Sequence, residues 1–185
     1  PKKLYLIEGN TARLGLTIVQ TAPIDGRQAT QYLKAEDYDA ILVDAPCSGL
    51  GVMRRKPDIK YTKREEDLKS LQTIQLNILK NAVQLLRVGG KLVYSTCTVD
   101  KEENEGTVKA FLANHPEMEA VALENLPEQL MTKQQDGMLQ VFPQDIGSDG
   151  FFVASPNMEY KISIIALFVH LVLGISPASY AFFVS

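Results

Sequence analysis

Two apolar runs, each followed at once by a cysteine-centred motif, constrain the fold of this chain more than any other feature. The first run, residues 38–43, precedes the motif DAPCSG, and the second, residues 91–94, leads into the motif YSTCT. Short continuous apolar runs are typical of buried parallel strands. Because ligands bind beyond the carboxyl ends of the strands in open α/β sheets, we expect Cys47, Cys97 and Asp44 to share one crevice.

Helix-like and strand-like segments alternate around these two runs. A loop at residues 45–57 follows the first motif, and Gly89 and Gly90 are expected to end the helix that precedes the second run. This alternation predicts an α/β fold with a doubly wound, Rossmann-like sheet, helices on both faces and an antiparallel edge built from the later strands. The predicted helices are residues 4–14, 65–86 and 102–114, and the predicted strands are residues 17–22, 38–43, 91–94, 138–142 and 151–154.

Basic side chains gather in one short segment of an otherwise mildly acidic chain. The net charge of −3 over 185 residues argues against nucleic-acid binding by the whole surface. The basic segment is either an RNA-facing surface or a solvated stretch balanced by the acidic residues 65–67. Its members are Arg54, Arg55, Lys56, Lys60, Lys63 and Arg64.

The cysteine and histidine content limits metal binding and indicates a compartment. The two cysteines and two histidines lack the paired spacings of the usual four-ligand structural zinc site, so we expect no metal. Nothing at the N-terminus resembles a secretion signal, which favours a reducing cytoplasm in which Cys47 and Cys97 remain free thiols. A disulfide between the two is the alternative.

The end of the chain is unusually apolar. Residues 162–175 are almost wholly hydrophobic, and AFFV at 181–184 follows Pro177. The run is shorter than the ~20 residues that a membrane-spanning helix requires, and Pro177 would break an extension of it. We therefore expect a buried helix or strand, or an apolar tail, rather than a membrane anchor, with His170 as a packed side chain.

Two long segments carry a family resemblance. DAPCSGLGVMRRKPDIK, residues 44–60, and GGKLVYSTCTVDKEENE, residues 89–105, resemble the Sun-type (NOL/NOP/Sun) RNA cytosine-5 methyltransferases, and most of all the bacterial enzymes that methylate small-subunit ribosomal RNA. The resemblance extends over about residues 4–154. It implies a class I methyltransferase sheet, S-adenosylmethionine as cofactor, and RNA rather than DNA as partner.

The resemblance also implies that this chain holds part of a catalytic domain. In the family, a first strand and a glycine-rich turn that cradles the cofactor come before the point at which these residues begin. Residues 1–155 are accordingly expected to form a partial methyltransferase domain, with an apolar tail at residues 156–185. The family's upstream RNA-binding domain also has no counterpart in these residues.

The resemblance assigns a role to each of four residues. Cys97 would be the nucleophile that adds to carbon 6 of cytosine and activates carbon 5, and Cys47 would help to release the methylated product. Asp44 would contact the cofactor and the target base, and Asp25 would bind the adenine amino group of the cofactor. Without the resemblance, each cysteine could be a small buried hydrophobic residue, Asp44 a loop cap and Asp25 part of an ordinary Asp-Gly turn.

Three other functions compete with an RNA methyltransferase that processes ribosomal RNA in the cytoplasm. A catalytically dead RNA-binding or assembly module would keep the same fold. DNA cytosine methyltransferases use similar chemistry but place their nucleophile in the Pro-Cys motif, so the assignment to Cys97 separates the two classes. A thiol redox protein is the third alternative, and the absence of a Cys-x-x-Cys motif counts against it.

Overall fold

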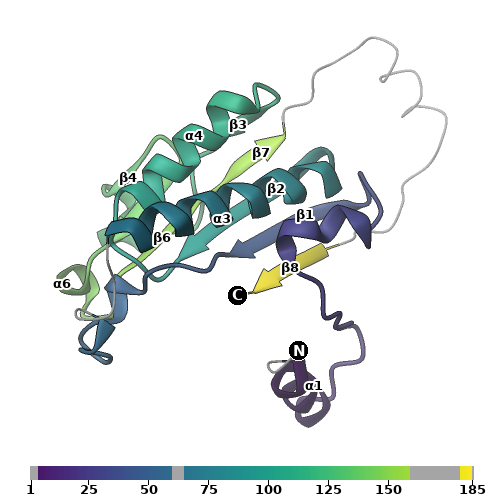
Figure 1. Cartoon of the computed structure of the whole chain (residues 1–185). Helices are drawn as coiled ribbons and strands as arrows, with labels where there is room; N and C mark the ends of the chain where they lie inside the picture. Colours follow the sequence, from purple (N-terminus) through teal and green to yellow (C-terminus); the bar gives the residue numbers. More distant parts are fainter. Residues whose placement is uncertain (1–3, 60–64, 159–179, 185) are drawn as a thin grey trace.

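A computed structural model describes residues 4–59, 65–158 and 180–184 of the chain. In this described part, one mixed sheet of eight strands carries helices packed against it (Figure 1). The order β3-β7-β2-β6-β5-β4 forms the main path, and β1 lies between β2 and β8. The strands are β1 Tyr38–Asp44, β2 Leu86–Thr96, β3 Met118–Ala120, β4 Gln134–Gln135, β5 Met138–Val141, β6 Phe151–Ala154, β7 Pro156–Met158 and β8 Tyr180–Val184.

The pairing direction changes across the sheet. β1 runs parallel to β2 and to β8, whereas β2 is antiparallel to β6 and β7, and the pairs β3–β7, β4–β5 and β5–β6 are antiparallel as well. A parallel pair needs a long crossover, and α3 (Glu65–Leu85) supplies it between β1 and β2, while the later strands follow shorter connections. The mixed α/β class is confirmed. The later strands pair antiparallel as expected, although they make up most of the sheet and not only an edge, and the Rossmann-like arrangement remains a prediction.

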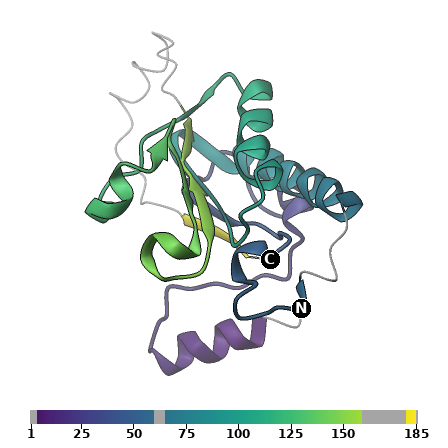
Figure 2. The same ribbon diagram turned by 90° about the vertical axis from the view of Figure 1, so that its left-hand side faces the viewer.

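Two helices pack side by side on the same face of the sheet, α3 and α4 (Figure 2). The predicted helix at residues 102–114 is present, but it opens with a π-helical turn, η3, before α4 begins. α1 lies apart from the sheet, and none of its residues is buried. The bounds of the helices and helical turns other than α3 are α1 Leu4–Arg13, η1 Gly26–Gln31, η2 Leu50–Val52, η3 Glu102–Gly106, α4 Thr107–Asn114, α5 Glu128–Met131 and α6 Pro143–Ile146.

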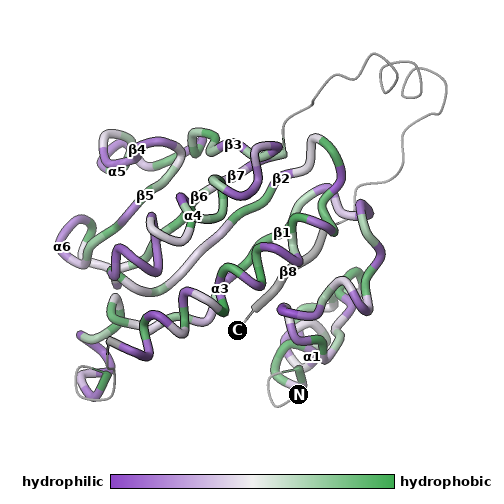
Figure 3. The backbone as a smooth tube through the Cα atoms, turned by 45° about the horizontal axis from the view of Figure 1, so that its top comes forward, coloured by the Kyte–Doolittle hydropathy of each residue, from purple (hydrophilic) through white to green (hydrophobic). Residues whose placement is uncertain are grey.

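The main core lies between the sheet and these two helices. Hydrophobic and hydrophilic residues alternate along α3, as Figure 3 shows, so one side of the helix faces the sheet. Leu79 and Ala82 on that side are fully buried. They share one cluster with Tyr94 of β2, Phe111 of α4 and Phe152 of β6, which ties the strand ends firmly to the helices behind them.

The strand predicted at residues 17–22 does not form. These residues follow α1 as an irregular segment, and Ile18 is 87% exposed. A strand needs a neighbouring edge that offers backbone hydrogen bonds, and both edges of β1 are already taken by β2 and β8. This segment therefore cannot pair with β1, and in the described residues it pairs with no other strand.

β2 begins before the glycines rather than after them. It starts at Leu86, directly after α3, so Gly89 and Gly90 lie inside the strand. The pairing with β1 shifts in register there, and Gly89 has φ of 76°, a conformation that glycine adopts without steric cost. The two glycines form a strand irregularity instead of ending the helix.

Part of the apolar end of the chain joins the sheet. The five residues of β8 pair in parallel with β1, from Tyr180 opposite Ala40 to Val184 opposite Asp44. The predictions for residues 162–175, including His170, lie outside the described residues. Among the helices of the described part, none is long and apolar enough to cross a lipid bilayer.

Candidate active site

The two cysteines lie close together at the edge where β1 and β2 end. Because the strands are parallel and Asp44 pairs with Ser95, the loops that follow them leave the sheet side by side. The backbone N–H of Ala45 continues this pairing by donating to the carbonyl oxygen of Ser95 at 2.9 Å. The sulfur atoms of Cys47 and Cys97 are 3.4 Å apart, a hydrogen-bonding distance between two free thiols. The predicted juxtaposition is confirmed, whereas the roles of the two cysteines remain predictions.

The pKa values of the two thiols are shifted in opposite directions. A hydrogen bond from the Cys47 thiol lowers the pKa of Cys97 to about 6, against the opposing effects of partial burial and the Asp44 charge. The same hydrogen bond, together with burial, raises the pKa of Cys47 well above its ordinary value. Cys97 is also the more exposed of the two residues. The lowered pKa favours the thiolate form of Cys97, and the raised pKa favours the protonated form of Cys47, in which its thiol donates to the Cys97 sulfur.

Asp44 stands beside this pair as the last residue of β1. Its carboxylate Oδ1 accepts a hydrogen bond from the Ser95 hydroxyl at 3.3 Å, and the side chain is partly exposed. Its negative charge raises the pKa of Cys97, because it disfavours a second negative charge nearby. The sequence thus correctly predicted three chemical groups at one sheet edge.

Asp25 has local partners instead. It caps the start of η1, where its carboxylate accepts from the Arg27 backbone N–H at 2.9 Å. The Arg27 guanidinium also forms an ion pair with it at 2.6 Å, and hydrogen bonding to Arg27 lowers the pKa of Asp25 to about 2. These contacts match the turn-like alternative raised from the sequence and do not join Asp25 to the cysteine pair.

A buried polar network lies beneath the cysteines, and sequence reasoning missed it. The side chains of Ser48, Gln75, Thr98, Glu103 and Asn104 are all at most 2% exposed. Ser48 follows Cys47 and Thr98 follows Cys97, and the hydroxyl groups of these two residues are hydrogen-bonded to each other at 2.8 Å. The available signal was the run of polar residues directly after each cysteine, together with the ENE segment at 103–105, which reads simply as a helix start.

Asn104 anchors the loop that carries Cys97. Its side-chain amide donates to the carbonyl oxygen of Thr98 at 3.0 Å and to Gln140 Oε1 at 2.6 Å. Its own oxygen accepts from Thr96 Oγ1 at 2.6 Å. The residues on both sides of Cys97 are therefore fixed to one side chain, which limits how far the sulfur can move.

Comparison with known proteins identifies the family. The sequence profile described as 16S rRNA methyltransferase RsmB/F matches residues 1–156. The chain belongs to the RsmB/F family. This family depends on S-adenosylmethionine and methylates ribosomal RNA, and the two cysteine motifs of the chain fall within the matched residues.

RsmB/F relatives from bacteria are similar along most of this chain. It is 48% identical over 155 residues to the probable ribosomal RNA small subunit methyltransferase B of Bacillus subtilis (strain 168), covering 83% of this chain and 35% of that protein. It is 39% identical over 154 residues to ribosomal RNA small subunit methyltransferase F of Cronobacter sakazakii, covering 82% and 32%. The chain spans about a third of the length of these relatives.

Solved structures of related methyltransferases share the fold of this RsmB/F chain. NSun6 from Pyrococcus horikoshii, solved with SFG, superposes with a TM-score of 0.71 at 30% identity, over 85% of this chain and 39% of that chain. A methyltransferase homologue protein from the same organism gives a TM-score of 0.66 at 25% identity, over 85% and 50%. The fold of most of this chain is thus shared with these two solved structures.

The basic loop of this RsmB/F chain is fastened to the segment before β6. Arg55 forms an ion pair with Asp149, and Arg54 donates to the carbonyl oxygen of Gly147 at 3.3 Å. Lys56 is exposed on the same loop. Of the predicted basic segment, Lys60, Lys63 and Arg64 lie outside the described residues. Arg54, Arg55 and Lys56 are thus carried by the loop whose Gly51 N–H bonds to the carbonyl oxygen of Cys97.

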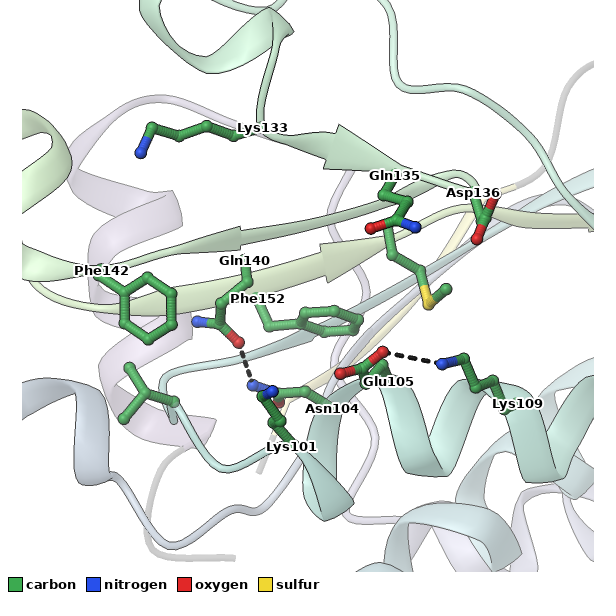
Figure 4. A pocket seen from close by; sticks show the side chains of 12 residues that line it. Lys101, Asn104, Glu105, Lys109, Lys133, Gln135, Asp136, Gln140, Phe142 and Phe152 are labelled. Atoms are coloured by element: carbon green, nitrogen blue, oxygen red, sulfur yellow. Dashed lines mark hydrogen bonds and ion pairs between the residues drawn. The ribbon is translucent and has the colours of Figure 1, made fainter.

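A separate pocket opens between η3, α4 and the β4–β5 hairpin (Figure 4). Phe152 and Met138 line it, and Lys101 and Lys109 lie at its sides. Lys109 pairs with Glu105 at 2.9 Å, so its charge is partly balanced. Val99, two residues after Cys97, also lines the pocket, whereas neither cysteine does. The pocket is therefore next to the cysteine site and separate from it.

Proposed function

We propose that this chain contributes the catalytic cysteines of an enzyme that transfers a methyl group from S-adenosylmethionine to carbon 5 of a cytosine in small-subunit ribosomal RNA. The observation that carries the proposal is the 3.4 Å contact between Cys47 and Cys97 at the edge that Asp44 shares. Membership of the RsmB/F family supports the reaction class. Ribosomal RNA as substrate also implies a cytoplasmic location.

Cys97 is the nucleophile in this proposal. Carbon 5 of cytosine is a weak nucleophile, and addition of a thiolate to carbon 6 converts the ring into an enamine that reacts at carbon 5. The lowered pKa of Cys97, about 6, keeps its sulfur in the reactive thiolate form at neutral pH. The face of the cytosine ring must lie against the Cys97 sulfur, so the target nucleotide has to leave the stack of its neighbouring bases.

Cys47 and Asp44 assist at different stages. The thiol of Cys47 holds its proton next to Cys97, where it donates to the attacking sulfur and can later take part in releasing the product. In this proposal the Asp44 carboxyl group contacts the target base and, in its protonated form, donates a hydrogen bond to ring nitrogen 3 as electron density develops there. After methyl transfer, a general base takes the carbon 5 proton, the double bond between carbons 5 and 6 forms again, and the bond from carbon 6 to the Cys97 sulfur breaks and releases the thiolate. Cys47 would be this base after it has given up its own proton.

The residues present fit the cofactor only in part. S-adenosylmethionine supplies an electrophilic methyl group when it is bound. Asp44 offers carboxylate oxygens at the cysteine edge, suited to the cationic and hydroxyl groups of such a cofactor. The carboxylate of Asp25, the proposed adenine-binding residue, is engaged by Arg27 at 2.6 Å and would have to exchange that partner. We therefore expect this chain by itself to bind the cofactor more weakly than micromolar, as calorimetry would measure.

Trapping of a covalent protein–RNA adduct tests the proposed reaction. The chain is incubated with small-subunit ribosomal RNA and S-adenosylmethionine, and denaturing gels detect RNA that remains attached to protein. The adduct is expected to accumulate in the Cys47→Ala variant and to disappear in the Cys97→Ala variant. Loss in the first variant and persistence in the second would exchange the two roles and contradict the proposal.

A second candidate function, an RNA-binding module without catalysis, is favoured by one observation. The loop that carries Arg54, Arg55 and Lys56 bonds to the backbone of Cys97 through the N–H of Gly51. RNA binding that weakens steeply with salt, and that is unchanged by alanine at either cysteine, would support this module.

A further inference from the structure

Two buried side chains hold the backbone on both sides of Cys47. The amide nitrogen of Gln75 donates to the carbonyl oxygen of Pro46 at 2.9 Å, and the Ser48 backbone N–H donates to Glu103 Oε2 at 2.9 Å. The Gln75 amide also donates to Glu103 Oε2 at 3.0 Å, which joins the two side chains. Both side chains have no exposed surface.

The two side chains are themselves held by their neighbours. Gln75 Oε1 accepts from the Thr107 hydroxyl at 3.2 Å, and the Glu103 backbone oxygen accepts from the Tyr94 hydroxyl at 2.7 Å. Gln75 comes from α3, Glu103 from η3 and Tyr94 from β2. Because three elements of the core fix these groups, the backbone around Cys47 takes its position from the core and not from solvent-facing loop contacts.

Burial of Glu103 is unfavourable for stability. A buried carboxyl group costs free energy unless all its oxygens are hydrogen-bonded, and Glu103 Oε1 has no partner in the described part of the chain. An apolar side chain of similar size would avoid that cost. A carboxyl group in this position is better explained by what it holds than by what it adds to the core.

The structure assigns Glu103 and Gln75 as positioning residues that form a buried clamp on Cys47 and so keep its thiol against Cys97. The inference rests on the proposed function, because that reaction is what requires the contact between the Cys47 and Cys97 sulfurs. It extends the proposal to residues that do not touch the substrate. The Ser48–Thr98 hydroxyl pair, 2.8 Å apart, completes the link between the two loops. The clamp sets the Cys47 side of the contact, and Asn104 sets the Cys97 side.

Alkylation by iodoacetamide as a function of pH tests the clamp in the intact chain, and peptide mass spectrometry identifies the modified cysteine. In the unmodified chain, Cys97 is expected to react first, with a midpoint near pH 6. Glu103→Leu and Gln75→Met remove the clamp's hydrogen bonds, so the midpoint should rise toward the ordinary thiol value of about 8.5 and Cys47 should become reactive. Thr107→Val removes the hydroxyl that supports Gln75 and also bonds to the carbonyl oxygen of Glu102, but it leaves the clamp's own hydrogen bonds in place. It should give a smaller rise, and it is the variant to use if the stronger variants do not fold.

The Glu103→Gln variant separates positioning from charge. Glutamine keeps an oxygen that accepts from Ser48, so the clamp predicts a midpoint no higher than that of the unmodified chain. If the charge alone mattered, Gln and Leu would move the midpoint in the same direction. Val108→Ala, which removes equally buried atoms from α4 without touching the loop, is the matched control.

The clamp is overturned if its variants have the same alkylation midpoint, and the same preference for Cys97 over Cys47, as Val108→Ala. The variants compared are Glu103→Leu, Gln75→Met and Thr107→Val, and Thr107→Val alone is decisive where the other two do not fold. The measurement needs neither RNA nor cofactor, so it is independent of the proposed reaction. A raised midpoint combined with no effect of Cys97→Ala on RNA adducts would retain the clamp and reject the methyltransferase.

Discussion

The backbone N–H of Gly51 donates to the carbonyl oxygen of Cys97 at 3.0 Å, so the loop after one cysteine binds the backbone of the other. The carbonyl oxygen of Gly51 in turn accepts from the N–H of Gly150 at 2.9 Å. Three chain segments therefore meet at the cysteine edge through backbone hydrogen bonds. A contact this close leaves no space for a side chain at position 51.

Gly51→Ala is expected to destabilise the protein and displace Cys97. The added Cβ would overlap the carbonyl oxygen of Gly150 and lie 2.7 Å from that of Cys97, and backbone atoms cannot give way easily. Overpacking of this kind costs about 1–3 kcal/mol. Chemical unfolding measures the loss. Gly9→Ala, whose Cβ would have no neighbour within 4 Å, is the control, and equal stabilities for the two variants would contradict the steric argument.

Removal of the Cys47 thiol should raise the pKa of Cys97. The hydrogen bond from Cys47 is the largest cause of the lowered value, about 6, so Cys47→Ala should move the alkylation midpoint upward toward about 8.5. Asp44→Asn should move it in the opposite direction, because the Asp44 charge raises the pKa of Cys97. An unchanged midpoint in Cys47→Ala would mean that the contact between the sulfurs is absent in solution.

The lowered pKa of Cys97 also predicts the sign of a stability change with pH. A thiol whose pKa is lower in the folded state contributes stability that is complete above the unfolded value and is lost as the pH falls through the folded value. For Cys97 that window lies between about 8.5 and about 6. Cys97→Ser should remove this part of the pH dependence in urea unfolding, and an identical profile would argue against a thiolate in the folded protein.

Exposed Lys56 is expected to contribute to RNA affinity through charge alone. Lys56→Ala should reduce the slope of log K against log salt by about 0.7 if the side chain neutralises one phosphate of single-stranded RNA. Fluorescence anisotropy at several salt concentrations measures the slope. Lys34→Ala is the matched control, because Lys34 is an exposed lysine paired with Asp37 and remote in sequence from the basic loop. Equal slopes for both variants would exclude Lys56 as a phosphate contact.

Deletion of residues 180–185 should expose an edge of β1. β8 pairs with that edge from Ala40 to Asp44, and an unpaired strand edge invites association with other chains. We expect the melting temperature to fall by several degrees and the shortened chain to self-associate in light scattering. Deletion of Ser185 alone is the control. A monomeric shortened chain with unchanged melting would show that β8 adds nothing to the sheet.

Local sequence patterns predicted most elements near the site, because the information was local. Apolar runs followed by polar motifs indicated β1 and β2, and the periodicity of residues 65–86 predicted α3 to within one residue. Residues 17–22 have a similar apolar character, yet they form no strand. Whether an extended segment becomes a strand depends on a free neighbouring edge, which lies far away in the sequence.

The sequence by itself determined that Cys47, Cys97 and Asp44 would meet, since parallel strands end at a common edge whatever surrounds them. Only the tertiary structure decided which thiol is acidic, because that depends on a 3.4 Å contact between residues 50 positions apart. It also decided that Glu103 lies inside the protein and holds the Cys47 loop. Burial and hydrogen-bond partners are properties of the assembled chain, and no local pattern of charged residues reveals them.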